Sequence, residues 1–446
     1  MALHPFFLRR MPLDPKQSRE RTMSDELQER VVEDQDYAQS CVPEGSRKGF
    51  WSMFVVMLGF TFFSASMWIG ATLGCGLTLK GFILTVLVGN LILGVYTSTL
   101  AWIASSNGLS VHLLARRSFG RKGSWLPSFL LAFTQIGWFG VGVAMCALPI
   151  QAYLSEKGIN VNIWPLVLIS GVLFTSSAYF GIKALTVISL VAVPLVAIGG
   201  CFSAVKVFVD DPGAWSKLVA FVPEEKNALT FGAAVAMTVG SFISGGTCTP
   251  DFVRFAKNRG IAVSTTAIAF FLGNSLMFTF GAVGGMFFET NDISEVLVKQ
   301  GLLVAGIIVL TLNIWTTNDN ALYTSGLGLA NITGLPKKLL VLVCGTLGTL
   351  TAVWLYNNFC GFLNVLNTTL PSIGAVLASD YIIVRRIRKD DSTPYYGIPA
   401  VVAWACGTLV ANFINVGISS INGIIVAFVV YGLLVVILDK LVKAKN

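Results

Sequence analysis

The amino-acid sequence predicts an all-helical membrane protein with twelve spans, in which two groups of five spans form inverted repeats and two further spans lie outside them. Its 446 residues are 54% hydrophobic and only 12% charged, with a mean hydropathy of +0.73, which is typical of polytopic membrane proteins. Two predicted spans, five apart in order, contain glycine and serine at mid-depth. An odd separation reverses the direction in which a helix crosses the membrane, so matching interruptions indicate an inverted repeat.

The chain divides into a polar tail, two groups of five predicted spans and a final pair. Residues 1–48 carry charges of both signs and no apolar stretch, so we predict a disordered cytoplasmic tail. The first repeat covers residues 49–209, the second covers 228–385, and 397–442 form the two peripheral spans. The spans are predicted at residues 50–78, 81–105, 125–153, 161–181, 184–209, 228–256, 261–288, 299–325, 337–355, 359–385, 397–416 and 420–441.

The distribution of basic residues accounts for the net charge of +8 without a nucleic-acid partner. Loops after the even-numbered spans up to the tenth are basic, whereas the loop after span seven contains Glu289, Asp292 and Glu295. Because basic loops of membrane proteins remain in the cytoplasm, both termini are predicted to be cytoplasmic. The basic loop residues are Arg116, Arg117, Arg121, Lys122, Lys183, Arg254, Lys257, Arg259, Lys337, Lys338, Arg385, Arg386, Arg388 and Lys389.

Span six contains the string Gly240-Ser241-Phe242-Ile243-Ser244-Gly245-Gly246, which favours an interruption of the helix. Each glycine destabilises a helix by about 1 kcal/mol relative to alanine. About a dozen mostly apolar residues lie on either side, which places the break near the middle of the bilayer. Non-helical backbone at this depth lies against protein or a water-filled cavity, so the break indicates a binding site.

Span one contains a matching string, Leu58-Gly59-Phe60-Thr61-Phe62-Phe63-Ser64-Ala65-Ser66, about ten residues into the span. Its glycine, β-branched and hydroxyl residues favour unwinding. Close packing of transmembrane helices at glycine is the alternative explanation. The similar depth of the two strings favours paired breaks in spans one and six.

Span eight carries a stripe of polar residues at the same depth. Asn313, Thr316, Thr317 and Asn320 follow the i, i+3, i+4, i+7 spacing of one helix face. An unpaired polar group in hydrocarbon costs several kcal/mol, so the stripe is expected to face protein, water or an ion. Threonine hydroxyls also bond carbonyls of their own helix, which leaves a purely structural role open. Oxygen ligands of this kind suit a hard monovalent cation such as sodium.

Span three places Gln135 and Trp138 on one helix face near mid-depth. Glutamine offers both a donor and an acceptor, while Trp138, Phe63 and Phe242 offer flat apolar faces. Aromatic residues in membrane spans also face lipid, but the glycines around Trp138 indicate a close helix contact on this side. These residue types suit a small, neutral, planar substrate with hydrogen-bonding groups.

Other function classes are disfavoured by the residues that the sequence lacks. Apart from Asp319, the deep parts of the spans contain almost no ionisable residue, which disfavours a charged substrate or a channel lining. There is no phosphate-binding loop, and His4 and His112 lack metal-ligand spacing. No serine has a histidine within a span to act as its base. We therefore expect neither an enzyme nor a cofactor, and a cation gradient is the expected energy source.

Four strings resemble a known transporter family. They are Thr61–Trp68, Gly137–Val143, Gly240–Ser244 and Asn313–Tyr323. From about residue 47 almost to the C-terminus, the chain resembles the nucleobase:cation symporter-1 family. The resemblance implies the LeuT-type fold with broken helices one and six, in agreement with the breaks inferred above. It also implies a location in the bacterial inner membrane, and we expect the monomer to be the functional unit.

The resemblance further implies positions for the cation and the substrate. The cation site maps to the carbonyls of Gly59 and Phe62 and to the side chains of Asn313, Thr316 and Thr317. The substrate site maps to Phe63, Gln135, Trp138, Phe242, Ser244 and Asn318. Many relatives have tryptophan at the position of Phe242 and the reverse order of the glutamine and tryptophan in span three. The sequence resembles the cytosine-specific branch at both places.

The predicted function is import of cytosine, coupled to sodium, by alternating access. Sodium is expected to tie span one to span eight, after which the substrate stacks between aromatic rings and bonds Gln135 and Ser244. Rocking of one bundle then opens the inner side, and Pro371 is either a gate hinge or a static kink. Proton coupling through Asp319 stays open, as do uracil, hydantoins, allantoin and purines as substrates. A channel or a membrane enzyme is the alternative from another class.

Overall fold

The computed structural model describes residues 36–290, 296–297, 299–385, 397–414 and 416–445. Within these ranges the chain is helical, and an isolated bridge between Lys48 and Ala256 is the one β-type pairing. The predicted tail up to residue 35 lies outside the described residues. So do the acidic residues predicted after span seven at 292 and 295, and the basic ones at 386, 388 and 389.

The helices follow the order of the predicted spans. The first group contains α2 (Phe50–Thr61), α3 (Ser64–Gly76), α4 (Leu79–Asn107), α5 (Val111–Phe119), α6 (Trp125–Glu156), α7 (Ile163–Tyr179), α8 (Ile182–Asp210) and the short α9 (Ala214–Ala220). The second group contains α10 (Phe231–Gly240), α11 (Ile243–Thr247), α12 (Thr249–Val253), α13 (Arg259–Ile268), η2 (Ala269–Asn274), α14 (Ser275–Phe288), α16 (Leu303–Thr333), α17 (Lys337–Asn357), α18 (Phe359–Thr369), α19 (Pro371–Ser379) and η3 (Asp380–Val384). The last two helices are α21 (Ile398–Phe413) and α22 (Ser419–Lys445).

Six helices of the described chain are long and apolar enough to cross a membrane, or seven if α2 and α3 form one bent span. Three of the expected spans are represented by the shorter apolar helices α7, α10 and α21. The exposed side chains of the long helices are largely apolar, as expected for surfaces that face lipid. The predicted all-helical, multi-pass fold class is confirmed, while the count of twelve spans stays a prediction.

Both predicted helix breaks are present. Helix α2 ends at Thr61 and α3 begins at Ser64, with a bend of 53° between them and extended backbone at Phe62 and Phe63. Helix α10 ends at Gly240 and α11 begins at Ile243. The second break is shorter than predicted. Ser244, Gly245 and Gly246 were expected to lie in the break, but they belong to helix α11. Residues in the breaks have backbone groups that no regular helix satisfies, and they lie inside the protein.

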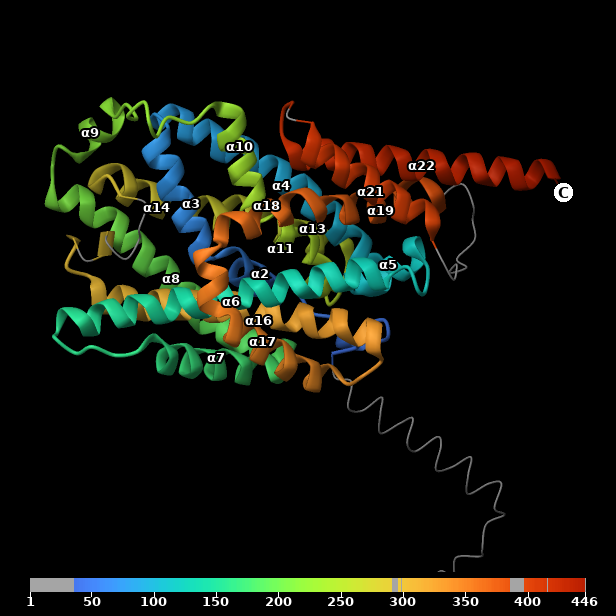
Figure 1. Ribbon diagram of the computed structural model, residues 1–446, viewed down its shortest axis with the longest axis horizontal. Coiled ribbons are helices and arrows are strands. Elements are labelled where there is room, and N and C mark those ends of the chain that lie inside the picture. Colours follow the sequence, from blue (N-terminus) through green and yellow to red (C-terminus); the bar gives the residue numbers. More distant parts are fainter. Residues whose placement is uncertain (1–35, 291–295, 298, 386–396, 415, 446) are drawn as a thin grey trace, which may run out of the picture.

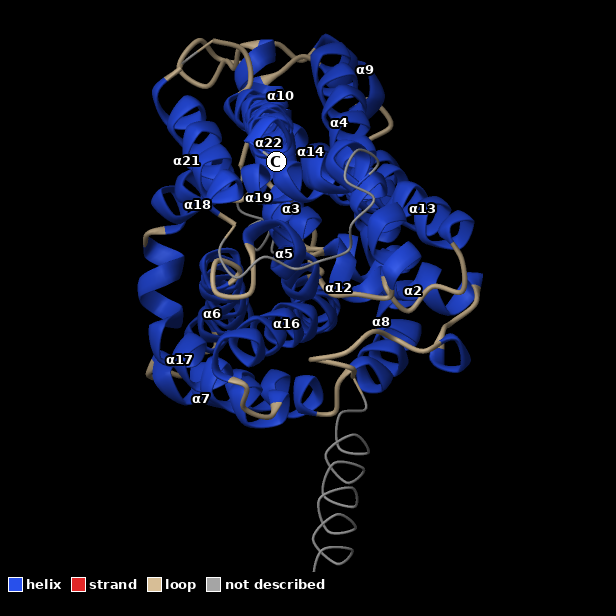
Figure 2. Cartoon of the chain, turned by 90° about the vertical axis from the view of Figure 1, so that its right-hand side faces the viewer, coloured by secondary structure: helices blue, strands red, loops and turns tan. Residues whose placement is uncertain are grey.

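The helices form two layers that meet at the broken segments. Helices α6, α7, α16 and α17 lie side by side in one layer, as both views show (Figures 1 and 2). Helices α4, α10, α13 and the pair α3 and α14 form the other layer, with α2 and the short α11 and α12 between them. Helices α21 and α22 pack against each other and against α19 at the periphery. The broken segments at the start of the two predicted repeats therefore meet at the centre of the molecule.

Residues 36–48, at the end of the predicted tail, pack against the helices. The buried guanidinium of Arg254, which follows α12, donates to the backbone carbonyls of Asp36 and Tyr37 at 2.7 and 2.8 Å. It also donates to the hydroxyl of Tyr323 in α16. A buried charge needs oxygen partners, so Arg254 orders this part of the chain. Residues 36–48, which we predicted as part of the disordered tail, are therefore packed against the helices.

Candidate functional site

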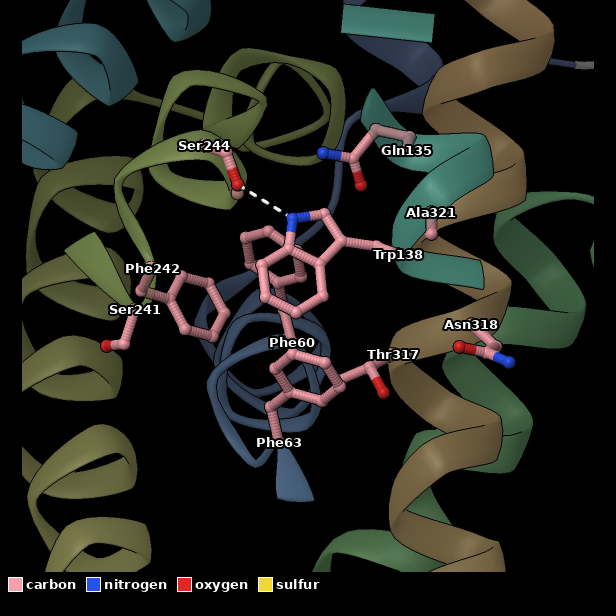
Figure 3. A pocket seen from close by; sticks show the side chains of 11 residues that line it. Phe60, Phe63, Gln135, Trp138, Ser241, Phe242, Ser244, Thr317, Asn318 and Ala321 are labelled. Atoms are coloured by element: carbon pink, nitrogen blue, oxygen red, sulfur yellow. Dashed lines mark hydrogen bonds between the residues drawn. The ribbon is translucent and has the colours of Figure 1, made fainter. Parts of the chain in front are cut away.

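The two helix breaks and helices α6 and α16 surround one cavity (Figure 3). All six residues predicted for the substrate site lie at its wall. The lining residues are Phe60, Phe63, Gln135, Trp138, Ser241, Phe242, Ser244, Gly245, Thr317, Asn318 and Ala321. Four of these, Phe60, Ser241, Gly245 and Ala321, were not predicted, although the first three belong to the interrupted strings and the fourth lies one turn after Thr317.

The cavity wall consists largely of aromatic rings arranged edge to face. The ring of Phe63 lies 5.2 Å from that of Trp138, at 76°, and 6.4 Å from that of Phe242, at 89°. Phe60 lies 5.1 Å from Phe242 at 85°. Such arrangements are stable in themselves, and aromatic rings of this kind can also stack on a flat ligand. These side chains come from α2, the first break, α6 and the second break, so no single helix forms the site.

The cavity is nearly closed by a hydrogen bond across it. Trp138 Nε1 donates to Ser244 Oγ at 2.9 Å, which joins α6 to α11 (Figure 3). The free space is about 30 Å³. A planar base that bonds Ser244 would displace this hydrogen bond. The amide nitrogen of Gln135 is buried there without a hydrogen-bond partner, which leaves a donor for a substrate.

Asn318 lies at the cavity wall, but its amide is engaged elsewhere. Its Nδ2 donates to the carbonyl of Phe139 in α6 at 3.2 Å, and the side chain fits against Gly142. Figure 3 shows it directed away from the aromatic rings. In this conformation Asn318 holds α16 against α6, so a contact with substrate would require it to turn.

Residues predicted for the cation site meet between α2 and α16. Thr316 Oγ1 donates to the carbonyl of Gly59 at 3.3 Å and to that of Asn313 at 2.8 Å. Both polar atoms of the Asn313 amide are buried without a partner. Phe62 follows the last residue of α2, so its carbonyl and that of Gly59 belong to the end of a helix, where negative partial charge accumulates. Thr317 bonds its own helix at the carbonyl of Asn313 and also lines the cavity.

The donor set at this position fits a hard monovalent cation. It offers carbonyl, amide and hydroxyl oxygens, with unpartnered atoms on Asn313. The hydroxyls of Thr316 and Thr317 also bond carbonyls of their own helix, so the structural role left open by the sequence is present as well. The two roles are compatible, because a hydroxyl oxygen that donates its hydrogen still has lone pairs for an ion.

Asp319 is fully buried on another face of α16. Its Oδ1 accepts a hydrogen bond from Ser177 Oγ of α7, and Trp315 Nε1 donates to the same hydroxyl at 2.7 Å. Its Oδ2 has no hydrogen-bond partner. Asp319 does not line the aromatic cavity, so a role in proton coupling would act through the contact between α7 and α16.

A second aromatic layer covers Trp138 on the side of α18. The rings of Phe359 and Phe362 each lie 5.7 Å from that of Trp138, and Phe359 stacks on Trp68 of α3 at 5.2 Å and 11°. Helix α18 ends at Thr369 and α19 begins at Pro371, so the bend predicted at this proline is present. The aromatic layer connects this interrupted helix to the cavity.

Comparison with known proteins agrees with this architecture. A family described as permeases for cytosine/purines, uracil, thiamine and allantoin matches residues 41–436. Cytosine permease of Escherichia coli O157:H7 is 49% identical over 413 residues, which cover 92% of this chain and 96% of the relative. The cytosine permease of strain K12 is 48% identical over the same length. A hydantoin permease of Microbacterium maritypicum is 24% identical over 309 residues, 63% of this chain and 62% of that protein.

Solved transporter structures share the fold. Mhp1, a nucleobase-cation-symport-1 family transporter in a closed conformation with bromovinylhydantoin bound, superposes with a TM-score of 0.75, 21% identity and coverage of 88% of this chain and 93% of that one. A Na⁺-coupled sialic acid symporter superposes with a TM-score of 0.69 at 12% identity, covering 88% and 90%. The similar proteins are permeases, so this chain is a transporter and not an enzyme. The chain belongs to the nucleobase:cation symporter-1 family of permeases for cytosine/purines, uracil, thiamine and allantoin.

Proposed function

We propose that the protein imports cytosine together with sodium by alternating access. The observation that carries this proposal is the position of Thr317, which lines the aromatic cavity while its neighbour Thr316 bonds the carbonyl of Gly59 in α2 and both hydroxyls bond the carbonyl of Asn313. One turn of α16 thus contributes residues to both the proposed cation site and the substrate cavity. An ion bound there holds α2 and α16 together and shapes the cavity wall at Phe60 and Phe63.

Cytosine is the proposed substrate because the cavity is aromatic and lined by no charged residue among those described. Gln135 has a free amide donor, and Ser244 Oγ becomes free when its bond from Trp138 opens. These groups suit the carbonyl, ring nitrogen and amino groups of a pyrimidine edge, while the aromatic faces stack on the ring. The identity of 49% to a cytosine permease supports the same substrate.

In the proposed cycle, sodium binds first between α2 and α16. The base then replaces the bond between Trp138 and Ser244, and its hydrogen bonds satisfy groups that are unpaired in the empty cavity. Because the loaded cavity has fewer unsatisfied polar atoms than the empty one, occupancy favours closure and permits the rocking step. Release on the other side requires the contacts of Arg254 with residues 36 and 37 to open.

We place both termini in the cytoplasm of a bacterial cell, with the protein in the inner membrane. The end of the molecule that carries α5 and residues 36–48 contains Arg116, Arg117 and Arg121, and basic residues remain on the cytoplasmic side. The monomer is the proposed functional unit, since one chain supplies every residue of the cavity and of the cation position.

The test is uptake of radiolabelled cytosine into proteoliposomes under an imposed sodium gradient, and in parallel under a proton gradient alone. Thr316→Ala removes the hydroxyl that faces Gly59, and we expect sodium to activate this variant about tenfold more weakly or worse. Thr346→Ala is the matched control, because Thr346 in α17 is exposed, donates to the carbonyl of Leu342 in its own helix and lines neither site. Its uptake is expected to equal that of the parent protein.

Each of the other possible outcomes would contradict one part of the proposal. Uptake driven by protons alone, lost in Asp319→Asn, would replace sodium by the buried carboxylate as the coupling group. Binding of a hydantoin or another nucleobase without cytosine uptake would retain the transporter and overturn the substrate. Sodium-driven uptake that is unchanged in Thr316→Ala would move the ion away from the contact between α2 and α16.

A further inference from the structure

The span formed by α13, η2 and α14 contains a π-helical turn, η2, in its middle. Backbone bonds of a π-helix run from residue i to i+5, so such a turn takes about one residue more than an α-helical turn. Buried pairs recur every four positions along this span, which is wider than the α-helical period of about 3.6 residues. The wider turn helps to keep these pairs on the inner face. The pairs are Thr265 and Thr266, Ala269 and Phe270, Gly273 and Asn274, and Met277 and Phe278.

Two buried asparagines hold this turn against α4. Asn274 Nδ2 donates to Asn90 Oδ1 at 2.8 Å, and Asn90 Nδ2 donates to Ser275 Oγ at 2.8 Å. Both asparagines are fully buried, and hydrocarbon offers no water to replace these bonds. About one turn further along α4, Gly94 leaves room for the ring of Phe271. The position of η2 relative to α4 is therefore fixed at two neighbouring points.

The same turn lies against the first helix break. A Cβ at Gly273 would collide with the hydroxyl of Thr61, so the backbone of η2 approaches this residue directly. Thr61 is the last residue of α2, and the extended backbone at Phe62 follows it. Helix α4 and the end of α2 thus confine η2 from two sides.

From this confined turn, the side chain of Phe270 packs against Phe242. The centroids of the two rings are 5.3 Å apart and the ring planes meet at 89°. Phe270 is fully buried and is not among the residues that line the cavity, whereas Phe242 lines it. Phe242 lies in the second break, where its φ of −133° and ψ of −1° are not those of a helix. Neighbouring side chains therefore determine where its ring lies.

We propose that Phe270 is a positioning residue of the substrate site, which holds the ring of Phe242 at the cavity wall from the π-helical turn. The proposal rests on the function proposed above, because it concerns the cavity assigned there to the base. A ring that is already fixed loses less freedom when the substrate binds, which raises affinity. A smaller side chain at position 270 lets the ring of Phe242 tilt, so affinity falls although Phe270 does not touch the substrate.

The test is binding of cytosine to the full chain in detergent with sodium, measured by isothermal titration calorimetry. Phe270→Leu removes the supporting ring and should weaken cytosine binding about fivefold or more. Phe278→Leu is the matched control, because Phe278 lies in the same span and is equally buried, but packs in the cluster of Ile69 and Leu73 and does not line the cavity. Both variants should have lower melting temperatures than the parent protein, whereas only Phe270→Leu should lose affinity.

A residue that acts through Phe242 should have little effect once Phe242 is removed. In the Phe242→Leu background, Phe270→Leu is therefore expected to change cytosine affinity by less than about twofold. Phe270→Met replaces the ring by a flexible chain that fills core gaps. It keeps the test valid if Phe270→Leu fails to fold, and it should also weaken cytosine binding.

Equal affinities of Phe270→Leu and Phe278→Leu for cytosine would overturn the proposal. So would a loss in Phe270→Leu that persists in full in the Phe242→Leu background, because Phe270 would then act independently of that ring. If the parent protein binds a hydantoin or another base and not cytosine, the proposed substrate is wrong. The same comparison with that ligand then decides the role of Phe270, so the two proposals fail separately.

Discussion

At the cavity wall, Gln135 is buried and its amide nitrogen has no hydrogen-bond partner. A buried donor without a partner lowers stability by about 1–3 kcal/mol. Gln151 on the same helix differs, since its amide donates to the carbonyl of Val161 at 2.9 Å. Gln151 thus supports the fold, whereas Gln135 is the glutamine of α6 that we propose to bind a ligand.

Gln135→Leu is therefore expected to weaken cytosine binding about tenfold or more without lowering the melting temperature of the empty protein. Gln151→Leu should lower the melting temperature and leave cytosine affinity unchanged. Isothermal titration calorimetry and thermal unfolding in detergent measure the two effects. A loss of stability in Gln135→Leu with unchanged affinity would assign Gln135 to the fold.

His112 in α5 is buried among groups from three other helices. Its Nδ1 lies 3.2 Å from Ser128 Oγ, and its Nε2 lies 3.2 Å from the carbonyl of Thr324 and 3.6 Å from Asp251 Oδ2. Burial lowers the pKa of His112, while the charge of Asp251 acts in the opposite direction. The positive charges of Arg254 and Arg116 lower the pKa of His112 further.

Because the folded protein holds His112 neutral, stability should be complete above its unfolded pKa of about 6.5 and decline as the pH falls below that value. We expect the melting temperature of the parent protein to fall between pH 6.5 and 5. His112→Gln removes the titrating group, so its curve should be flatter over this window. Parallel curves for the two proteins would show that other groups determine the acid sensitivity.

Helices α3 and α14 approach each other so closely that only glycine fits at their contact positions. Gly70 of α3 faces the backbone of Phe278, and Gly281 of α14 faces the backbone carbonyl of Met67. Gly74 and Gly285 repeat the contact one turn further along, which is the small-residue spacing of tightly packed transmembrane helices. The second half of the first broken helix, α3, and α14 therefore form one tightly packed pair.

Both helices of this pair are preceded by an interruption, and the two interruptions lie next to each other. The break at Phe62 and Phe63 precedes α3, and the π-helical segment η2 precedes α14. Gly273 of η2 fits directly against Thr61, the last residue of α2. π-Helical turns inside long helices often mark functional positions. The non-helical break before α3 and the π-helical segment before α14 thus lie side by side where this pair joins the rest of the molecule.

Gly281→Ala is expected to separate α3 from α14, because the added Cβ would collide with the carbonyl oxygen of Met67. Overpacking of this kind costs about 1–3 kcal/mol, so the melting temperature should fall by several degrees. Gly232→Ala in α10 is the matched control, since a Cβ there has no neighbour within 4 Å. Similar melting temperatures for Gly281→Ala and Gly232→Ala would refute the close contact.

For the molecule as a whole, the cavity is enclosed by contacts that lie far apart in the sequence. Arg254 ties the segment after α12 to residues 36 and 37 and to Tyr323 in α16. Cys248, between α11 and α12 and six residues before Arg254, is fully buried. If the protein opens on this side by breaking the bonds of Arg254, we expect Cys248 to become accessible.

In a variant that retains Cys248 alone among the cysteines, Arg254→Gln should raise the rate of alkylation by a maleimide about tenfold or more. Hydrogen bonds of a charged donor are worth about 1.5–3 kcal/mol each, and their loss shifts the equilibrium toward opening. Lys257→Gln, an exposed neighbour, should leave the rate unchanged. Equal rates in both variants would show that Arg254 does not hold this side closed.

The amino-acid sequence was sufficient to predict the membrane class, the two helix breaks and the residues that meet at the cavity. Apolar length, glycine content and polar spacing are local properties, and each acts directly on the helix that carries it. Phe63, Gln135, Trp138, Phe242, Ser244 and Asn318 were placed at one cavity by family resemblance together with depth in the membrane. The ion, the exact substrate and the direction of transport stay predictions.

Only the tertiary structure decided which polar groups are satisfied and by which partners. Trp138 and Ser244 are 106 residues apart, and Arg254 and Tyr37 are 217 apart, so no local pattern predicts their bonds. The same holds for the turn of Asn318 toward Phe139 and for the packing of Phe270 against Phe242. The physical reason is that helix formation depends on neighbours along the chain, whereas the partner of a buried polar group depends on how the helices pack.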